Sequence, residues 1–545
     1  MAFSPLSSPL RTLSYQLAMA LSLVFYGVSA SAQTVPVQGR TLTELAADLS
    51  AGRISSALLV KTYLARIAAI DRAGPGLHAV LSLNPNALKE AIALDAERKA
   101  GHLRGPLHGI PILVKDNIET KDPIATTAGS LALAQNITGR DSPLVANLRA
   151  AGVIILGKTN LSEWANLRST RPISGWSGIG GFTHNPYVLN RSACGSSSGS
   201  GAAVAASLAA AAIGSETDGS VTCPASMNGV IGIKPTLGLV SRTHIVPISH
   251  TQDTAGPLAA SVRDAAELLS VMAGSDPADP ATVDADAHKA DYAKMLDANS
   301  LRGTRIGVMR FLAGFHPETD AVFARALQTL KSAGATLVEI DSLPGYETIA
   351  NAELTVMTTE LKTDLNAYLA TTPATVKSRT LADLIAFNQA HADRELALFG
   401  QELFIKAQAT KGFADPAYIA AYTANKKLAG PQGIDKFIAA DHLDALVAPT
   451  AGPAFVLDIA NGDNNLGSTT TLAAIAGYPH VSVPMGAVYG LPVGLSIFGP
   501  AWSDGKMLSY AYAFEQTLKL HQHPQYLIDV KTNPPLKDLL LPVKR

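Results

Sequence analysis

Charged residues and cysteine are scarce in this chain of 545 residues. Asp, Glu, Lys and Arg together make up 16% of the sequence, against roughly a quarter in an ordinary globular protein. The 43 basic residues are balanced by 44 acidic ones, so the chain lacks the positive excess with which a basic surface binds nucleic acid. Two cysteines are too few for a fold that is built on disulfides.

Apolar residues, by contrast, are abundant. They account for 47% of the chain, and the mean hydropathy is +0.18. These values exclude an intrinsically disordered protein, which combines high charge with few apolar residues. A chain of this length can bury a large core, and length alone would allow two to four domains.

The N-terminal segment has the features of a secretory signal peptide. Arg11 precedes an apolar run from Leu17 to Val28, and Ala30-Ser31-Ala32 follows it. This run is short for a membrane span, which needs about 20 residues, and the small residues are typical of a cleavage site. We therefore expect residues 1–32 to be removed and residues 33–545 to be exported, either periplasmic or secreted. An uncleaved anchor is the alternative.

Strand and helix patterns alternate along the rest of the chain without a Pro/Gly/Ser-rich linker. This order predicts one large α/β domain rather than several domains. The expected strands lie within Gly109–Ile118 and at Val153–Leu156, Arg305–Met309, Thr336–Ile340, Leu443–Val447 and Val481–Val483. The expected helices are two pieces within Thr41–Ala73, one at Ala202–Ala212 and one that carries Phe323, Leu327 and Leu330.

Two short motifs match known patterns but lack the required context. Gly152–Thr159 matches the P-loop pattern, yet its loop positions are Val, Ile, Ile and Leu, which favour a strand over a phosphate-binding loop. Gly195–Gly199 matches the nucleophile elbow G-x-S-x-G, but the segment before it is polar rather than a buried strand. No Cys/His spacing indicates a metal site. We therefore reject ATP binding and the α/β-hydrolase triad, and we expect no metal or cofactor.

Lys115 is an isolated positive charge at the end of the apolar segment Ile110–Val114. In a strand it shares a face with Leu113 and Asn117. A free lysine is neutral at pH 7 in only about 0.04% of molecules, but burial lowers its pKa and can make it a general base. The alternative is an ordinary lysine that is solvated or paired with Asp116.

Two polar turns carry candidate nucleophiles. Four serines, at 196, 197, 198 and 200, lie in the loop Gly195–Gly201, which could equally be a flexible loop that caps the next helix. The second turn runs from Gly214 to Ser220, where Gly219 would allow the backbone to approach a ligand closely. Successive N–H groups there could form an oxyanion hole.

Taken together, these segments resemble the amidase signature family of serine hydrolases. The resemblance rests on GPLHGIPILVKDNI around Lys115, CGSSSGSGAAVAA from Cys194 and IGSETDGSVTCPA around Ser220. Further matching segments, in chain order, are TTAGS, LRAAGVIILGKTNLSEWA, GIKPTLGLVSR, DTAGP, GYPHVSVP and LPVGLSIFG. They run through nearly all of residues 33–545, so the family fold is expected throughout: a mixed β-sheet with helices on both faces.

The resemblance implies a Ser-Ser-Lys triad. In the family the bridging serine lies 24 residues before the nucleophile, and here 220 − 196 = 24. Ser220 is thus the expected nucleophile, Ser196 on a cis peptide the expected proton relay and Lys115 the expected neutral base. The backbone N–H groups of Thr217, Asp218, Gly219 and Ser220 form the expected oxyanion hole.

The sequence also departs from the family pattern at Asp218, where glycine is usual. A carboxylate there would oppose the oxyanion unless its side chain points away. The motifs around Cys194 and Cys223 are most similar to those of bacterial peptide amidases, which implies a peptide with a C-terminal amide as substrate. Alternatives are a fatty or aryl amide, or the role of glutaminase subunit in a tRNA-dependent amidotransferase. Whether the two cysteines are bonded stays open.

Overall fold

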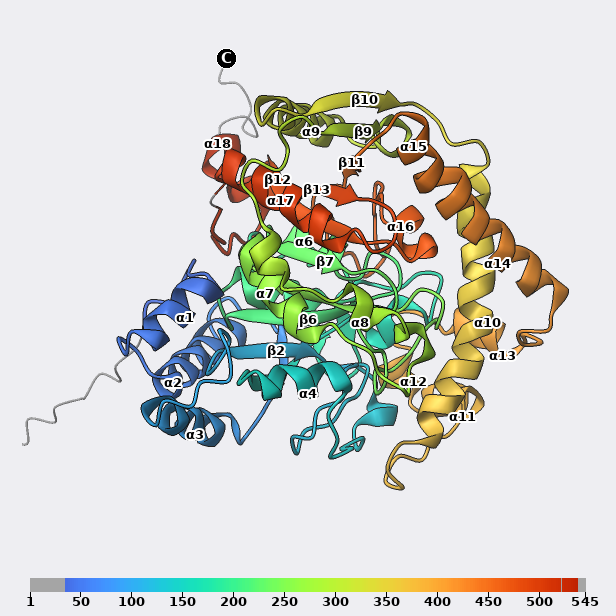
Figure 1. Cartoon of the computed structure of the whole chain (residues 1–545). Helices are drawn as coiled ribbons and strands as arrows, with labels where there is room; N and C mark the ends of the chain where they lie inside the picture. The colour runs from blue at the N-terminus through green and yellow to red at the C-terminus, as the bar shows by residue number, and fades with distance from the viewer. Residues whose placement is uncertain (1–34, 521, 538–545) are drawn as a thin grey trace, which may run out of the picture. The chain divides into compact units, whose positions relative to one another are not determined.

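A computed structural model describes residues 35–520 and 522–537, so the expected signal peptide at 1–32 lies outside the described residues. The core is a mixed sheet of 11 strands in the order β1-β3-β2-β6-β8-β7-β12-β13-β11-β9-β10 (Figure 1). Its strands are β1 Val80–Leu83, β2 Pro111–Lys115, β3 Ile154–Thr159, β6 Ala211–Glu216, β7 Ile231–Lys234, β8 Thr254–Ala259, β9 Arg305–Met309, β10 Thr336–Ile340, β11 Ala445–Pro449, β12 His480–Val488 and β13 Leu491–Phe498. A separate pair joins β4 Trp176–Ser177 and β5 Gly181–Phe182.

Helices flank this sheet, as expected for a single α/β domain. They are α1 Leu42–Ser50, α2 Ser56–Arg66, α3 Ala87–Lys99, α4 Pro143–Ala150, α5 Ser198–Ala205, α6 Thr222–Met227, α7 Val262–Met272, α8 Ala285–His288, α9 Pro317–Ser332, α10 Ile349–Ala370, α11 Leu381–Ala390, α12 Ala392–Glu395, α13 Glu402–Gln408, α14 Pro416–Ala429, α15 Asp435–Ala440, α16 Thr471–Ala476, α17 Asp504–Leu518 and α18 Pro534–Lys537. Helix α17 contacts both α7 and α9, while α5 and α6 contact each other and the central strands. Among the described residues, none of the helices combines the length and apolar character needed to cross a bilayer.

Local sequence explains where several of these elements begin. Thr41 and Glu44 form a reciprocal capping box at the start of α1, and the Ser55 hydroxyl accepts a hydrogen bond from Leu58 N at the start of α2. Strand β2 is buried at all five positions. It lies between the parallel strands β3 and β6, which accounts for its uninterrupted apolar run.

The expected helix at Ala202–Ala212 is wrong in its second half. Helix α5 ends at Ala205, Ser207 takes a left-handed backbone with φ of 53°, and Ala211 begins β6, which is inserted between β2 and β8. Nearly every residue of this stretch is buried. Because a fully buried run of small residues shows neither helical nor strand periodicity, its sequence does not distinguish the two.

Helix α10 closes one side of the domain. It packs along α14, and Figure 1 shows the two lying side by side. The inner side of α10 contributes Leu361, Leu365 and Leu369 to an apolar cluster that also contains Trp164 and Leu167. This cluster fixes α10 against the loops that follow the central strands.

Candidate active site

The carboxyl ends of β2 and β6 lie next to each other and place Lys115 beside Ser215. The two strands are parallel, with Leu113 paired to Ala212 and Val114 to Ile213. Side chains that leave the ends of neighbouring parallel strands converge at one edge of a sheet, which is where α/β proteins commonly build their sites.

Lys115 is completely buried at this edge and contacts three oxygen atoms. Its Nζ lies 2.8 Å from Ser196 Oγ, 3.0 Å from Ser215 O and 3.0 Å from Ser215 Oγ. Burial lowers the pKa of Lys115 to about 7, against the opposing charges of Asp253 and Glu216. Lys115 is therefore neither solvated nor paired with Asp116, and the alternative interpretation is wrong.

Asp116 points to a different part of the core. Its carboxylate accepts hydrogen bonds from the backbone N–H and the hydroxyl of Thr127. Asn117, in contrast, shares the face of Lys115 as the alternation predicts, since its Nδ2 donates to Ser215 Oγ over 2.8 Å. Ser215 thus contacts Lys115 directly and Asn117 contacts Ser215, two roles that the sequence motifs do not indicate.

The two expected catalytic serines lie on loops that are joined by a backbone hydrogen bond. The Gly195–Ser196 peptide bond is cis, and Ser196 O accepts from Ser162 N over 3.0 Å. Ser197 N donates to Ser220 O over 3.0 Å, so the two loops are in direct contact. Ser196 is fully buried, whereas Ser220 is 8% exposed. Within the part of the chain that the structure describes, the Ser220 hydroxyl forms no hydrogen bond, to Ser196 or to any other group.

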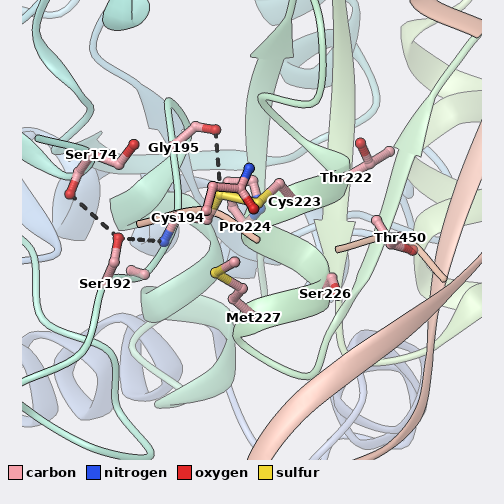
Figure 2. The surroundings of a disulfide bond; sticks show 12 residues. Ser174, Ser192, Cys194, Gly195, Thr222, Cys223, Pro224, Ser226, Met227 and Thr450 are labelled. Carbon is pink, nitrogen blue, oxygen red and sulfur yellow. Dashed lines mark hydrogen bonds between the residues drawn. A yellow bond between two sulfur atoms is a disulfide. The ribbon is translucent and has the colours of Figure 1, made fainter. Parts of the chain in front are cut away.

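A disulfide between Cys194 and Cys223 also ties these loops together (Figure 2). The two Cα atoms are 6.0 Å apart, and the cysteines are separated by 29 positions in the sequence. Cys194 lies two residues before Ser196, and Cys223 lies three residues after Ser220. The bond is packed in an apolar cluster with Tyr187. The two cysteines, whose pairing the sequence left open, are thus bonded.

The turn between β6 and α6 presents unused backbone donors. Among the described residues, the N–H groups of Asp218, Gly219 and Ser220 donate to no other group. Gly219 has φ of +78°, and a Cβ there would lie 3.0 Å from Thr470 Oγ1, so the turn requires glycine. Glu216 accepts from Val221 N and Thr222 N at 2.7 and 2.9 Å and fixes the far end of the turn. Such an arrangement of free N–H groups can hold an oxyanion.

The Asp218 side chain points away from these donors. Its Oδ2 accepts a hydrogen bond of 2.7 Å from Thr471 Oγ1, and its carboxyl group lies next to that of Glu353. Burial raises the pKa of Asp218. The departure from the family pattern is therefore compatible with an oxyanion site.

A cavity of about 400 Å³ opens beside this cluster. Its wall includes Asn117, Ser215 and Thr217, together with Asp253 and Arg242. Thr217 Oγ1 donates to Asp253 Oδ1 over 2.6 Å. The cavity thus reaches the groups that surround Lys115 and the first residue of the oxyanion turn.

The P-loop match is part of the sheet. Gly157, Lys158 and Thr159 belong to β3, and Lys158 is fully buried, with its Nζ bound to Ile118 O and to Thr126 Oγ1. Burial lowers the pKa of Lys158 to about 8. This lysine stabilises the core instead of binding phosphate.

One group of side chains has the composition of a metal site. His250, Glu360 and Asp364 bring their ligand atoms within 4.8 Å of one another. Glu360, however, already accepts hydrogen bonds from Thr251 and from Tyr418, at 3.0 and 2.7 Å. Hydrogen bonding within the protein therefore accounts for this arrangement.

Comparison with known proteins identifies the family. The model of the family described as Amidase matches residues 58–508. The chain belongs to the amidase signature family. It is an amidase, a hydrolase that acts on C–N bonds.

Solved structures and curated relatives agree with this assignment. The native peptide amidase from Stenotrophomonas maltophilia is 51% identical, with a TM-score of 0.86 over 90% of this chain and 99% of its own. An amidase family protein from Bacillus anthracis is 34% identical, with a TM-score of 0.81 over 89% of this chain and 92% of its own. A glutamyl-tRNA(Gln) amidotransferase subunit from Salinispora arenicola is 36% identical over 87% of this chain and 96% of its own.

Proposed function

We propose that this amidase hydrolyses the C-terminal amide of peptides through an acyl-enzyme, with Ser220 as nucleophile, Ser196 as proton relay and Lys115 as base. The contacts of Lys115 carry the proposal. A neutral amine has two N–H groups and one lone pair. The two N–H groups match Ser215 O and Ser215 Oγ, at 3.0 Å each, which leaves the lone pair for the Ser196 hydroxyl at 2.8 Å.

The first half of the reaction forms the acyl-enzyme. Ser220 Oγ attacks the amide carbonyl carbon and gives its proton to Ser196, whose own proton passes to Lys115 Nζ. The negative charge on the carbonyl oxygen is held by the N–H groups of residues 217–220. The C–N bond then breaks as the proton returns through Ser196 to the leaving nitrogen, which departs as ammonia.

The second half regenerates the enzyme. A water molecule attacks the ester carbon, and its proton follows the same relay to Lys115. The ester C–O bond breaks, Ser220 recovers its proton and the peptide leaves as a carboxylic acid. Ser220, Ser196 and Lys115 thus carry all the protons that are transferred in this cycle.

Replacement of Ser220 tests these roles. Ser220→Ala should abolish both ammonia release and labelling by a fluorophosphonate, while the exposed Ser275→Ala control should retain both. Lys115→Met should retain the fold, as judged by its melting temperature, and should label far more slowly. Wild-type turnover in Ser220→Ala would refute the assignment.

The peptide substrate is supported by the similarity to the Stenotrophomonas maltophilia enzyme, and glutamine is the rival because of the amidotransferase relatives. Ammonia release should be measured from N-acetylated dipeptide amides, a fatty amide, an aryl amide and glutamine at equal concentrations. We expect the highest kcat/KM for the dipeptide amides. A preference for glutamine would favour the glutaminase role instead, and a preference for the fatty or aryl amide would favour that substrate class.

We also propose that the protein is exported and cleaved after Ala32. The Cys194–Cys223 disulfide supports an oxidising compartment, since cytosolic thiols are kept reduced. Intact-mass and N-terminal analysis of the protein from a cell fraction should give Gln33 as the first residue in the exported pool. A full-length chain confined to the cytoplasm would contradict export.

A further inference from the structure

Two carboxyl groups meet beside the proposed oxyanion site. Glu353 is the fifth residue of α10 and is 5% exposed, and its carboxyl group lies next to that of Asp218. Asp218 Oδ1 is buried and receives no hydrogen bond from an N–H or hydroxyl group of the described residues. Oδ1 therefore depends on the carboxyl group of Glu353 for a donor.

A hydrogen bond between two carboxyl groups requires a proton on one of them. Asp218 is the better site for the negative charge, because Thr471 Oγ1 donates to it and the ammonium group of Lys234 is close by. Among the described residues, Glu353 has one donor, Gln252 Nε2 at 2.8 Å from its Oε1. Burial and the negative charge of Asp218 raise the pKa of Glu353 well above its usual value. Glu353 therefore carries the shared proton and donates it toward Asp218.

Other ionisable groups face the pair from several elements. Lys234 on β7 stabilises negative charge on Asp218, whereas Glu216 on β6 opposes it. Tyr346, in the turn before α10, faces both carboxyl groups, and its pKa is raised to about 12 by burial and by their charge. Lys426 on α14 faces Lys234. One positive neighbour thus accommodates one negative charge on the pair, and a second negative charge would be uncompensated.

The same residues fix the backbone of the turn. Gln252 Nε2 is shared between Glu353 Oε1 and Thr217 O, the latter at 3.4 Å. Asp218 is held on one side by Thr471 and on the other by Glu353. Glu353 therefore touches, directly or through Gln252, both residues that begin the turn.

We propose that Glu353 is a positioning residue for catalysis, and that its protonated carboxyl group holds Asp218 and, through Gln252, Thr217, so that the N–H groups of the turn face the oxyanion. The inference rests on the proposed roles of Ser220 and of residues 217–220. Loss of the shared proton places a second negative charge beside the developing oxyanion and breaks the bond to Asp218 Oδ1. Activity should fall at high pH for this reason.

Replacement of Glu353 by glutamine separates the effect of the added negative charge from the effect of losing the bond to Asp218. In Glu353→Gln the new amide N–H₂ donates to Asp218 and its carbonyl oxygen accepts from Gln252, but the side chain no longer titrates. We expect kcat at pH 7 within about twofold of wild type and no loss of kcat at high pH. Glu353→Leu removes the donor, and kcat should fall about 100-fold with little change in KM, the effect of a misplaced catalytic geometry.

The measurement is ammonia release from an N-acetylated dipeptide amide, which has no titratable group, between pH 6 and pH 10. Glu347→Gln is the matched control, because Glu347 is exposed and lies six residues before Glu353. Melting temperatures show whether Glu353→Leu is folded. A high-pH decline that is the same in wild type and Glu353→Gln would overturn the inference, and so would an unchanged kcat in folded Glu353→Leu. If Ser220→Ala retains turnover, the proposed function fails instead, so the two failures are distinguishable.

Discussion

Reduction of the Cys194–Cys223 bond should impair catalysis more than it impairs stability. The bond joins the segment that leads into Ser196 to the helix that follows Ser220, and it closes a loop of 29 positions. Loop-closure entropy for a loop of this length corresponds to about 3.6 kcal/mol of stabilisation at 25 °C. When this lost stabilisation is divided by the unfolding entropy of a chain of this size, the melting temperature falls by only roughly 3 °C.

The effect on turnover is expected to be larger because both serines lie within three residues of a cysteine. A displacement of about 1 Å between reacting groups can cost about 100-fold in rate. We therefore expect kcat to fall roughly 10- to 100-fold on reduction, with KM nearly unchanged, since the bond does not line the cavity described above.

The assay compares oxidised enzyme with enzyme that has been reduced and alkylated under native conditions. The Cys194→Ala/Cys223→Ala double variant, which has no thiol, controls for the reagents: it should match the reduced enzyme and should not respond to reductant. Ammonia release gives kcat, and thermal denaturation gives the melting temperature. Full kcat in the reduced enzyme, once mass spectrometry has shown two alkylated cysteines, would refute the reasoning.

Three further predictions concern protons and hydrogen bonds. Because burial lowers the pKa of Lys115 to about 7 and the base must be neutral, kcat/KM should fall about tenfold per pH unit below pH 7; a flat profile from pH 5.5 to 8 would contradict this. Ser215→Ala removes one hydrogen-bond acceptor of Lys115. The loss of about 1 kcal/mol should reduce kcat several-fold. The decline of kcat/KM at low pH should also shift to lower pH, because the charged lysine loses more stabilisation than the neutral one. His480 is fully buried and burial lowers its pKa to about 3, so the unfolded chain binds a proton below pH 6.5 that the folded chain does not. The free energy of unfolding should therefore fall by roughly 2 kcal/mol between pH 6.5 and 5. Denaturant titrations of His480→Gln should lack this part of the slope.

The strands and helices with regular patterns can be predicted from the sequence, and prediction fails where burial removes the pattern. Strands β9 and β10, with α9 between them, lie where alternation and helical spacing predict them. The run from Ala202 to Ala212 is misassigned because small buried residues serve a helix and a strand equally well. The turn at Ser207 that separates α5 from β6 has no glycine or proline to mark it.

The same limit applies to the candidate site. Lys115, Ser196 and Ser220 can be selected because each lies in a segment with a distinctive local pattern, and the structure brings Lys115 and Ser196 into contact. Glu353 cannot be selected, because it lies 135 positions beyond Asp218 in a helix where charged residues are common. Only the packing of α10 against the rest of the fold turns this glutamate inward.

In this chain of low charge content, the few charged groups near Lys115 affect its pKa. A lysine can remain neutral near pH 7 only if nearby carboxylates do not restore its pKa, yet Asp253 and Glu216 are both close to Lys115. Each of these carboxylates is held by donors of its own: Asp253 by Thr217, Ile248 N and Ser249 N, and Glu216 by the N–H groups at the start of α6. Burial raises the pKa of both carboxyl groups, to about 6 for Asp253, and desolvation remains the dominant influence on the lysine. The base strength of Lys115 therefore depends on the charge state of these neighbouring carboxyl groups as well as on its own burial.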